Sequence, residues 1–144
     1  LEGGRAPRPD LVLAPQHLAA LHGAIRAGLV ASCHDLSDGG LGVALAEMAF
    51  SGEIGLEVDL GEVPLKSETD VNSVLFSESA SRLLVEVRPA DADAFEGLMG
   101  EHIWSRIGMC TDKRSLDIVS GGREILSLDL CLMKDAWQGT LKNL

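Results

Sequence analysis

The segment from Leu41 to Phe50 constrains the fold most, because it is apolar around most of its circumference. Its sequence, LGVALAEMAF, has apolar residues at helical spacing on two sides and a single charged residue, Glu47. A surface helix is apolar along one stripe, whereas a helix that is apolar on nearly all sides packs between layers. We therefore expect a helix over 41–50 that lies between two layers of a globular domain.

Helical and strand periodicities alternate along the rest of the chain, which predicts an α+β domain. Expected strands carry apolar residues at every second position, and expected helices at every third or fourth. Gly121 and Gly122 separate two apolar runs and indicate a hairpin within a late strand meander. The expected fold is a single mixed β-sheet with helices packed on it. The expected helices are 15–27, 41–50, 70–75, 91–99 and 133–141, and the expected strands are 29–33, 54–60, 83–87 and several within 104–130.

The charge of the chain excludes two classes of partner. Among 144 residues, 22 are acidic and 12 are basic, which gives a formal net charge of −10. Nucleic acids and acidic membranes attract clusters of Lys and Arg, and the sequence contains no such cluster. No apolar run approaches the roughly 20 residues that span a bilayer. We therefore expect no nucleic-acid partner and no membrane partner.

The three cysteines, Cys33, Cys110 and Cys131, are widely spaced and form neither a disulfide framework nor a metal-binding pattern. Such cysteines are typical of a reducing compartment, so we expect a cytoplasmic location. Cys33 adjoins a strand and is expected to be a small buried side chain without nucleophilic reactivity.

The first residues have the composition of a linker between domains. Residues 1–9 are rich in Gly, Pro and Arg, and the chain begins with Leu1 instead of Met. Pro15 suits the first turn of a helix. We expect residues 1–14 to be a linker from a missing upstream domain and residues 15–144 to be one domain, so that the chain is a piece of a longer polypeptide.

The turn His34–Gly40 is the first candidate for chemistry, because it leads from an expected strand into the apolar helix. A helix N-terminus offers free backbone N–H groups and a positive dipole end, which can hold a phosphate. Asp35 and Asp38 would repel that phosphate unless a cation such as Mg²⁺ lay between. A structural interpretation is more common: Ser37 or Asp38 caps the helix, and the two glycines satisfy the turn geometry. No second His or Cys cluster is present, so no metal site is expected within the chain.

The loop Phe76–Arg82 is the second candidate. Its hydroxyls on Ser77, Ser79 and Ser81 and its carboxylate on Glu78 can bind a phosphate or a sugar together with backbone donors. A serine-rich segment between two ordered elements is also often only a loop. The residues by themselves leave both interpretations open.

Two motifs resemble the signatures of one enzyme family. The run 31–49, ASCHDLSDGGLGVALAEMA, closely resembles a signature of the phosphoribosylformylglycinamidine synthase family, and the run 75–83, LFSESASRL, is similar to its second signature. Their order matches the C-terminal half of the second repeat of that enzyme. The resemblance implies the fold of the aminoimidazole ribonucleotide synthase C-terminal domain. One departure is Ala80, where the family often has Gln, which puts a direct ligand contact from this position in question.

The resemblance implies that the parent protein is an ATP-dependent carbon–nitrogen ligase of purine biosynthesis. Such enzymes convert formylglycinamide ribonucleotide, ATP and glutamine-derived ammonia to formylglycinamidine ribonucleotide. Mg²⁺ and ATP would be bound mainly by the missing N-terminal domains of the same chain. The glutaminase would be another domain or a separate subunit. This fragment would hold no catalytic residue and would be inactive in isolation.

The resemblance also implies roles for single residues at a domain interface. The candidates for substrate or nucleotide binding are Ser77, Glu78, Ser79 and Ser81. The residues expected to shape the wall of that site are Asp35, Asp38, Gly39 and Gly40. Two alternatives stay open: a structural module of that enzyme that binds no ligand, or the equivalent domain of another ATP-using relative such as aminoimidazole ribonucleotide synthase.

Overall fold

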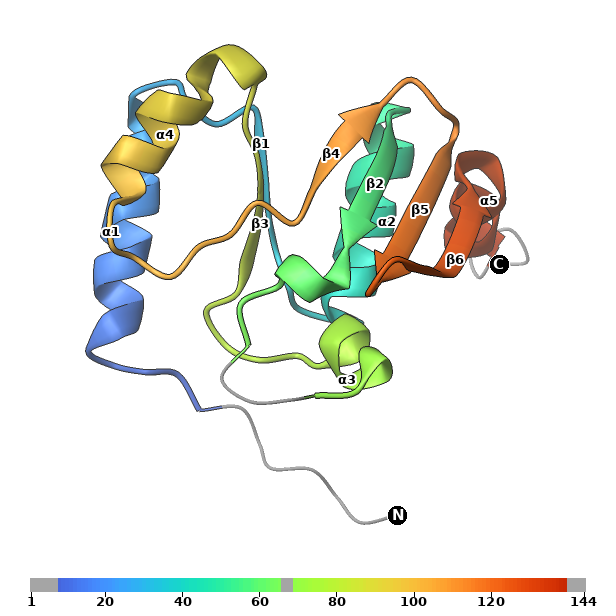
Figure 1. The fold of residues 1–144 in the computed structure, drawn as a ribbon, viewed down its shortest axis with the longest axis horizontal. Coiled ribbons are helices and arrows are strands. Elements are labelled where there is room, and N and C mark those ends of the chain that lie inside the picture. Colours follow the sequence, from blue (N-terminus) through green and yellow to red (C-terminus); the bar gives the residue numbers. More distant parts are fainter. Residues whose placement is uncertain (1–7, 66–68, 140–144) are drawn as a thin grey trace.

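The computed structural model describes residues 8–65 and 69–139 and arranges them as two β-ladders, each covered by helices (Figure 1). The helices are α1 (Leu13–Arg26), α2 (Gly40–Gly52), α3 (Val71–Phe76), α4 (Ala92–Met99) and α5 (Leu130–Gly139), with 3₁₀ turns at Leu60–Glu62 and Pro89–Asp91. The strands are β1 (Ser32–Asp35), β2 (Gly55–Asp59), β3 (Leu83–Glu86), β4 (Gly108–Thr111), β5 (Ser115–Ser120) and β6 (Arg123–Asp129).

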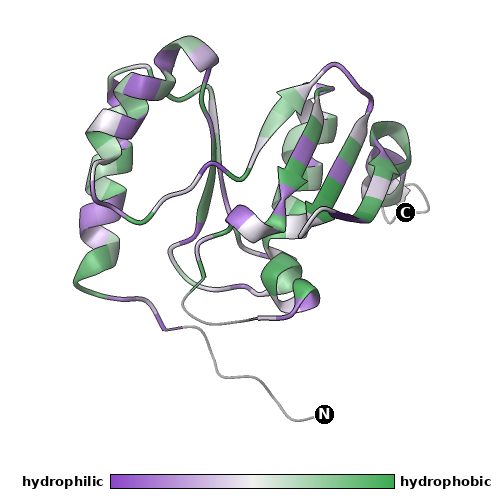
Figure 2. Ribbon diagram, viewed as in Figure 1, coloured by the Kyte–Doolittle hydropathy of each residue, from purple (hydrophilic) through white to green (hydrophobic). Residues whose placement is uncertain are grey.

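The larger sheet has four strands in the order β4-β2-β5-β6. Its central pair, β2 and β5, is parallel, while β4 and β6 are antiparallel to their neighbours, so the sheet is mixed. Apolar and polar residues alternate along β2 and β5 (Figure 2), as expected for strands with one buried face. Val58, Leu116 and Ile118 are buried on the face that α2 covers. Gly121 and Gly122 have positive φ angles and close the β5–β6 hairpin, as the sequence predicted.

The smaller ladder pairs β1 with β3 in antiparallel register, from Ser32 opposite Glu86 to Asp35 opposite Leu83. Helices α1 and α4 lie side by side and cover it (Figure 1). Leu21, Ala24, Phe95 and Met99 form the buried core of this layer, against partly buried side chains of β3. The turn 34–40 follows from β1, and the loop 76–82 leads into β3. Because β1 and β3 are paired, the two candidate segments lie next to each other.

The α+β class and the mixed sheet with helices on it are confirmed, but two details of the predicted topology are wrong. The strands form two ladders instead of a single sheet. The late strands do not form a simple meander either, because β2 lies between β4 and β5. Periodicity identifies which residues of a strand face a core, but it does not specify which strand lies beside it.

Helix α2 lies between layers, as its apolar circumference predicted. Leu41, Ala44 and Leu45 belong to the core beneath the four-stranded sheet. Ala49 and Phe50 pack with Leu130 at the start of α5. The helix is therefore covered by the sheet on one side and by α5 on another (Figure 1).

Helix α1 begins at Leu13, inside the segment expected to be a linker. The carboxylate of Asp10 accepts hydrogen bonds from the N–H groups of Val12 and Leu13 at 3.0 and 2.9 Å. This contact satisfies donors that a helix N-terminus otherwise leaves free. Residues 1–7 of the expected linker lie outside the described residues. Within the described ranges, no helix is long and apolar enough to cross a membrane.

Candidate functional site

The turn between β1 and α2 is held by backbone hydrogen bonds and by a residue from a distant segment. The N–H of Leu36 donates to the carbonyl oxygen of Arg82 at 3.1 Å, and the N–H of Gly40 donates to that of Ser37 at 3.0 Å. Gly39 occupies the N-cap position of α2 with φ of 81°, a conformation that glycine adopts without strain. The turn is thus tied both to itself and to the loop before β3.

The helix cap differs from the sequence prediction, which assigned it to Ser37 or Asp38. No side chain at the N-cap position bonds to the first turn of α2. Instead, the carboxylate of Glu78 accepts a hydrogen bond from the N–H of Gly39 at 2.9 Å. A carboxylate at a helix N-terminus is also favoured by the helix dipole. The two motifs singled out in the sequence are therefore joined by a direct bond.

Gly40 lets α2 approach the loop closely. A Cβ atom at this position would lie 2.8 Å from the carbonyl oxygens of both Leu75 and Ser77. Its φ of 64° is also in the left-handed region. A glycine at this position is therefore required by both the space and the backbone conformation.

The loop that follows α3 is ordered by an arginine. The Nη1 atom of Arg82 donates to the carbonyl oxygen and the hydroxyl of Ser77, at 3.3 and 3.2 Å. Arg82 is half-buried, and this desolvation lowers the pKa of its guanidinium. Ser81 has a positive φ of 65°, which turns the chain sharply into β3. Ser77 is thus engaged within the loop, while Ser79 and Ser81 are exposed.

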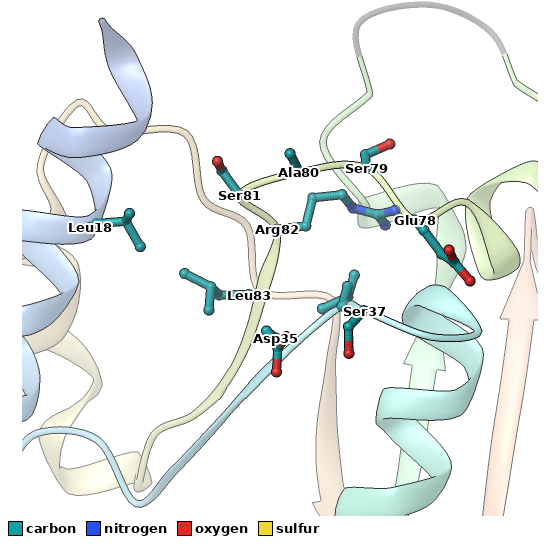
Figure 3. Close-up of a pocket in the computed structure, with 10 residues that line it drawn as sticks. Leu18, Asp35, Ser37, Glu78, Ser79, Ala80, Ser81, Arg82 and Leu83 are labelled. Atoms are coloured by element: carbon teal, nitrogen blue, oxygen red, sulfur yellow. The ribbon is translucent and has the colours of Figure 1, made fainter. Parts of the chain in front are cut away.

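A cavity of about 290 Å³ lies where the turn and the loop meet (Figure 3). Leu18 and Leu83 point toward one another on its apolar side, and the carboxylate of Glu78 points toward the first turn of α2. The cavity is lined by Leu18, Asp35, Leu36, Ser37, Glu78, Ser79, Ala80, Ser81, Arg82 and Leu83. It therefore has an apolar end next to α1 and a polar end next to α2.

The structure gathers some of the predicted site residues at this cavity and leaves others outside it. Glu78, Ser79 and Ser81, predicted to bind ligand, line the cavity, as does Asp35 from the turn. The remaining predicted residues, Ser77, Asp38, Gly39 and Gly40, do not line it. Ser77 and Gly39 contribute indirectly, since they bond to lining residues.

The sequence interpretation missed the contribution of α1 and misjudged one cysteine. Leu18 was assigned only to a helical pattern, and nothing in its spacing indicates that it reaches the cavity. Cys33, expected to be buried, is exposed on β1. Its thiol is nevertheless partly desolvated by neighbouring atoms, and this desolvation and the nearby Asp35 carboxylate raise the pKa of the thiol, which keeps it in the less reactive protonated form.

The cavity offers hydroxyl donors and mixed charges. Ser37, Ser79 and Ser81 can donate to phosphate or sugar oxygens. The lining also carries two carboxylates, from Asp35 and Glu78, and one guanidinium, from Arg82. Within the residues that the structure describes, no three His, Cys, Asp or Glu side chains lie close enough together to hold a metal ion. These residues by themselves do not fit a Mg²⁺ site, so a Mg²⁺ ion here would need ligands from elsewhere.

We expect Glu78→Ala to lower the free energy of unfolding by about 1 kcal/mol, because helix-capping bonds contribute about 0.5–2 kcal/mol. Glu78→Gln should lower the free energy of unfolding by less. Its amide oxygen can still accept a hydrogen bond from the Gly39 N–H, although without the negative charge. Urea denaturation of the three proteins measures the difference. Equal stability of all three would show that this bond does not support the turn.

Comparisons with known proteins place the chain in a family. The family described as "AIR synthase related protein, C-terminal domain" matches residues 1–121. The phosphoribosylformylglycinamidine synthase subunit PurL of Lactobacillus helveticus is 39% identical over 138 residues, and that of Thermobifida fusca is 38% identical over 141 residues. Each alignment covers 96% of this chain and 17% of the relative. The chain thus spans only a small part of these relatives.

Solved structures show the same fold. PurL of Thermotoga maritima complexed with FGAR superposes with a TM-score of 0.79 and 22% identity, over 92% of this chain and 23% of that chain. The same protein complexed with ATP gives a TM-score of 0.75 and 23% identity, over 91% of this chain and 24% of that chain. The PurLQS structure from this organism gives a TM-score of 0.75 and 22% identity, over 83% and 21%. With most of its length matched by the family and its fold matched by these structures, the chain belongs to the family of AIR synthase related protein C-terminal domains.

Proposed function

We propose that this chain is the C-terminal domain of the second repeat of an ATP-dependent phosphoribosylformylglycinamidine synthase. The parent protein would convert formylglycinamide ribonucleotide, ATP and glutamine-derived ammonia to formylglycinamidine ribonucleotide in the cytoplasm. The observation that carries this proposal is the meeting of the two signature segments at one cavity, joined by the bond from Gly39 to Glu78. The names of the 38–39% identical relatives support it.

Within that enzyme, this domain would supply one wall of a nucleotide or ribonucleotide site. Ser79 and Ser81 are exposed at the cavity, and their hydroxyls would donate to phosphate or ribose oxygens. Glu78 and Ser77 would hold the loop in shape, through Gly39 and Arg82 respectively. Asp35 would face the ligand from the turn. Asp38 and Gly40 would act indirectly, as parts of the turn that determine its path.

The rest of the catalytic machinery would come from other parts of the parent protein. A bound Mg²⁺ ion would neutralise the phosphates of ATP, which the carboxylates of Asp35 and Glu78 otherwise disfavour. We place its ligands in the N-terminal domains of the parent protein, joined to this domain through the segment that precedes α1. The PurLQS structure of the Thermotoga relative supports a glutaminase partner. The isolated chain would have no synthase activity.

The test is calorimetric titration of the full-length parent enzyme with Mg·ATP and with formylglycinamide ribonucleotide. In Ser79→Ala and Ser81→Ala, we expect the affinity for one of the two ligands to fall about fivefold, which corresponds to one lost hydrogen bond of about 1 kcal/mol. Ser51→Ala provides the matched control, because Ser51 is exposed at the far end of α2. Unchanged affinities in both serine variants would contradict the proposed ligand wall.

The second candidate is a module that supports the catalytic domains and binds no ligand. It is favoured by the internal engagement of the site, where Glu78 and Arg82 already bond to Gly39 and Ser77. It is also favoured by the exposure of Leu11, Val12 and Phe76, which offer apolar surface for a neighbouring domain. Unchanged ligand affinities together with an active parent enzyme would identify this role.

A further inference from the structure

Three polar side chains outside the cavity connect β1, α2 and α5. The indole Nε1 of Trp137, on α5, donates to Oε1 of Glu47 on α2 at 2.9 Å. The Nε2 atom of His34, on β1, lies 3.2 Å from Oε2 of the same carboxylate. Glu47 thus uses one oxygen for each of two elements that are far apart in the sequence.

Glu47 is the one charged residue of α2, a helix that otherwise consists of apolar and small residues and Ser51. Its side chain is 28% exposed, so much of it is removed from water. A partly buried carboxylate is destabilising unless its oxygens accept hydrogen bonds. Trp137 and His34 each contact one oxygen of Glu47, and the loss of either leaves that oxygen without its protein partner.

His34 links the carboxylate of Glu47 to the turn at the candidate site. Its Nδ1 atom is 2.6 Å from the carbonyl oxygen of Asp35, which can only accept a hydrogen bond. The two ring nitrogens thus contact the Asp35 carbonyl oxygen and the Glu47 carboxylate, one on each side of the imidazole. Asp35 ends β1, lines the cavity and precedes the turn that Glu78 caps. The imidazole therefore lies between the partly buried carboxylate of Glu47 and Asp35, a residue of the cavity wall.

Trp137 is held by more than apolar packing. Its ring lies 5.7 Å from that of Phe50, at an angle of 50°. The side chain is nevertheless 56% exposed, so burial alone does not fix its orientation. The indole N–H bond to Glu47 supplies a directional constraint that a contact between rings lacks.

We infer that Trp137, Glu47 and His34 are positioning residues of the candidate site, which hold Asp35 and the following turn in place relative to the loop 77–82. The last helix thereby influences a cavity that it does not line. The expected effect on ligand affinity rests on the proposed function, whereas the effect on the turn does not.

The experiment uses the full-length parent enzyme and follows amide hydrogen exchange by mass spectrometry. Trp137→Phe keeps the ring beside Phe50 and removes only the N–H donor, and Glu47→Gln replaces one accepting oxygen by a donor. We expect the amides of residues 36–40 to exchange about fivefold faster in both variants, as for the loss of one bond of about 1 kcal/mol. The affinity for the ligand that responds to the Ser79 and Ser81 variants should fall by a similar factor.

Two controls separate positioning from general loosening. Phe50→Leu weakens the packing of α5 on α2 but leaves the Trp137 N–H in place, so exchange should rise in α5 and not in 36–40. His34→Gln retains an N–H donor for Glu47. Its amide exchange at 36–40 should therefore be closer to that of the unmodified enzyme than the exchange of His34→Ala is.

Unchanged exchange at 36–40 in Trp137→Phe and Glu47→Gln would overturn the inference, and so would an equal rise in Phe50→Leu. If the serine variants alter affinity and these two do not, the inference also fails. If the serine variants alter nothing, the proposed function has failed, and the exchange at 36–40 alone decides the positioning role.

Discussion

Replacement of Gly40 by alanine is expected to lower the free energy of unfolding by about 2–5 kcal/mol. A left-handed conformation costs a residue with a Cβ about 1–2 kcal/mol, and Gly40 has φ of 64°. The new methyl group would also lie 2.8 Å from the carbonyl oxygens of Leu75 and Ser77. Forced overpacking of this kind costs typically 1–3 kcal/mol. The contact involves backbone on both sides, so it is relieved only if α2 and the loop move apart.

The matched control for this substitution is Gly28→Ala. Gly28 has a similar φ of 75°, but no atom lies within 4 Å of its added Cβ. Gly28→Ala should therefore lower the free energy of unfolding only by the cost of the left-handed conformation, about 1–2 kcal/mol. Urea denaturation of both variants measures the difference. If Gly28→Ala destabilised the chain as much as Gly40→Ala, the close approach of α2 to the loop would contribute nothing.

Leu45→Ala is expected to lower the free energy of unfolding by about 3–5 kcal/mol, the range found for leucines deleted from well-packed cores. Leu45 is 2% exposed and lies in the core between α2 and the four-stranded sheet. Truncation would leave a cavity lined by residues of both layers, which the backbone can fill only in part.

Leu132→Ala makes the same chemical change on α5, where the side chain is 67% exposed. It should change the free energy of unfolding by no more than about 0.5 kcal/mol, as is usual for surface positions. A small effect of Leu45→Ala in the same denaturation experiment would contradict the placement of α2 between layers.

The position of α2 between layers was predictable because a helix that is buried on several sides needs apolar residues on each of them, and this pattern is visible in the sequence. A run such as 41–50, with apolar residues on nearly every side, has no stable place at a surface. The strand neighbours were not predictable in this way. Leu56 and Val58 show that β2 has a buried face, but the same pattern allows β2 at an edge or at the centre of a sheet. Its position between β4 and β5 depends on the path of the whole chain.

The candidate site was predictable in its parts but not in its assembly. Both segments stand out because Asp, Gly and Ser cluster between apolar runs. Their contact depends on the pairing of β1 with β3, which places the turn beside the loop. Local reasoning assigned the cap of α2 to Ser37 or Asp38, since capping residues usually precede their own helix. Glu78 accepts the bond instead, because the tertiary fold brings its carboxylate next to the N–H of Gly39.

The order of strands in the larger sheet has a consequence for synthesis on the ribosome. The central parallel ladder joins β2 to β5, and residues 60–114 lie between them, including β3, α4 and β4. Contacts between segments so distant in sequence form slowly, because the intervening chain must be ordered first. During synthesis α2 is made before residues 60–114, whereas β5 and β6 are made after them. Until β5 has been synthesised, the apolar face of α2 lacks part of the sheet that covers it, and during that interval the domain is most exposed to aggregation.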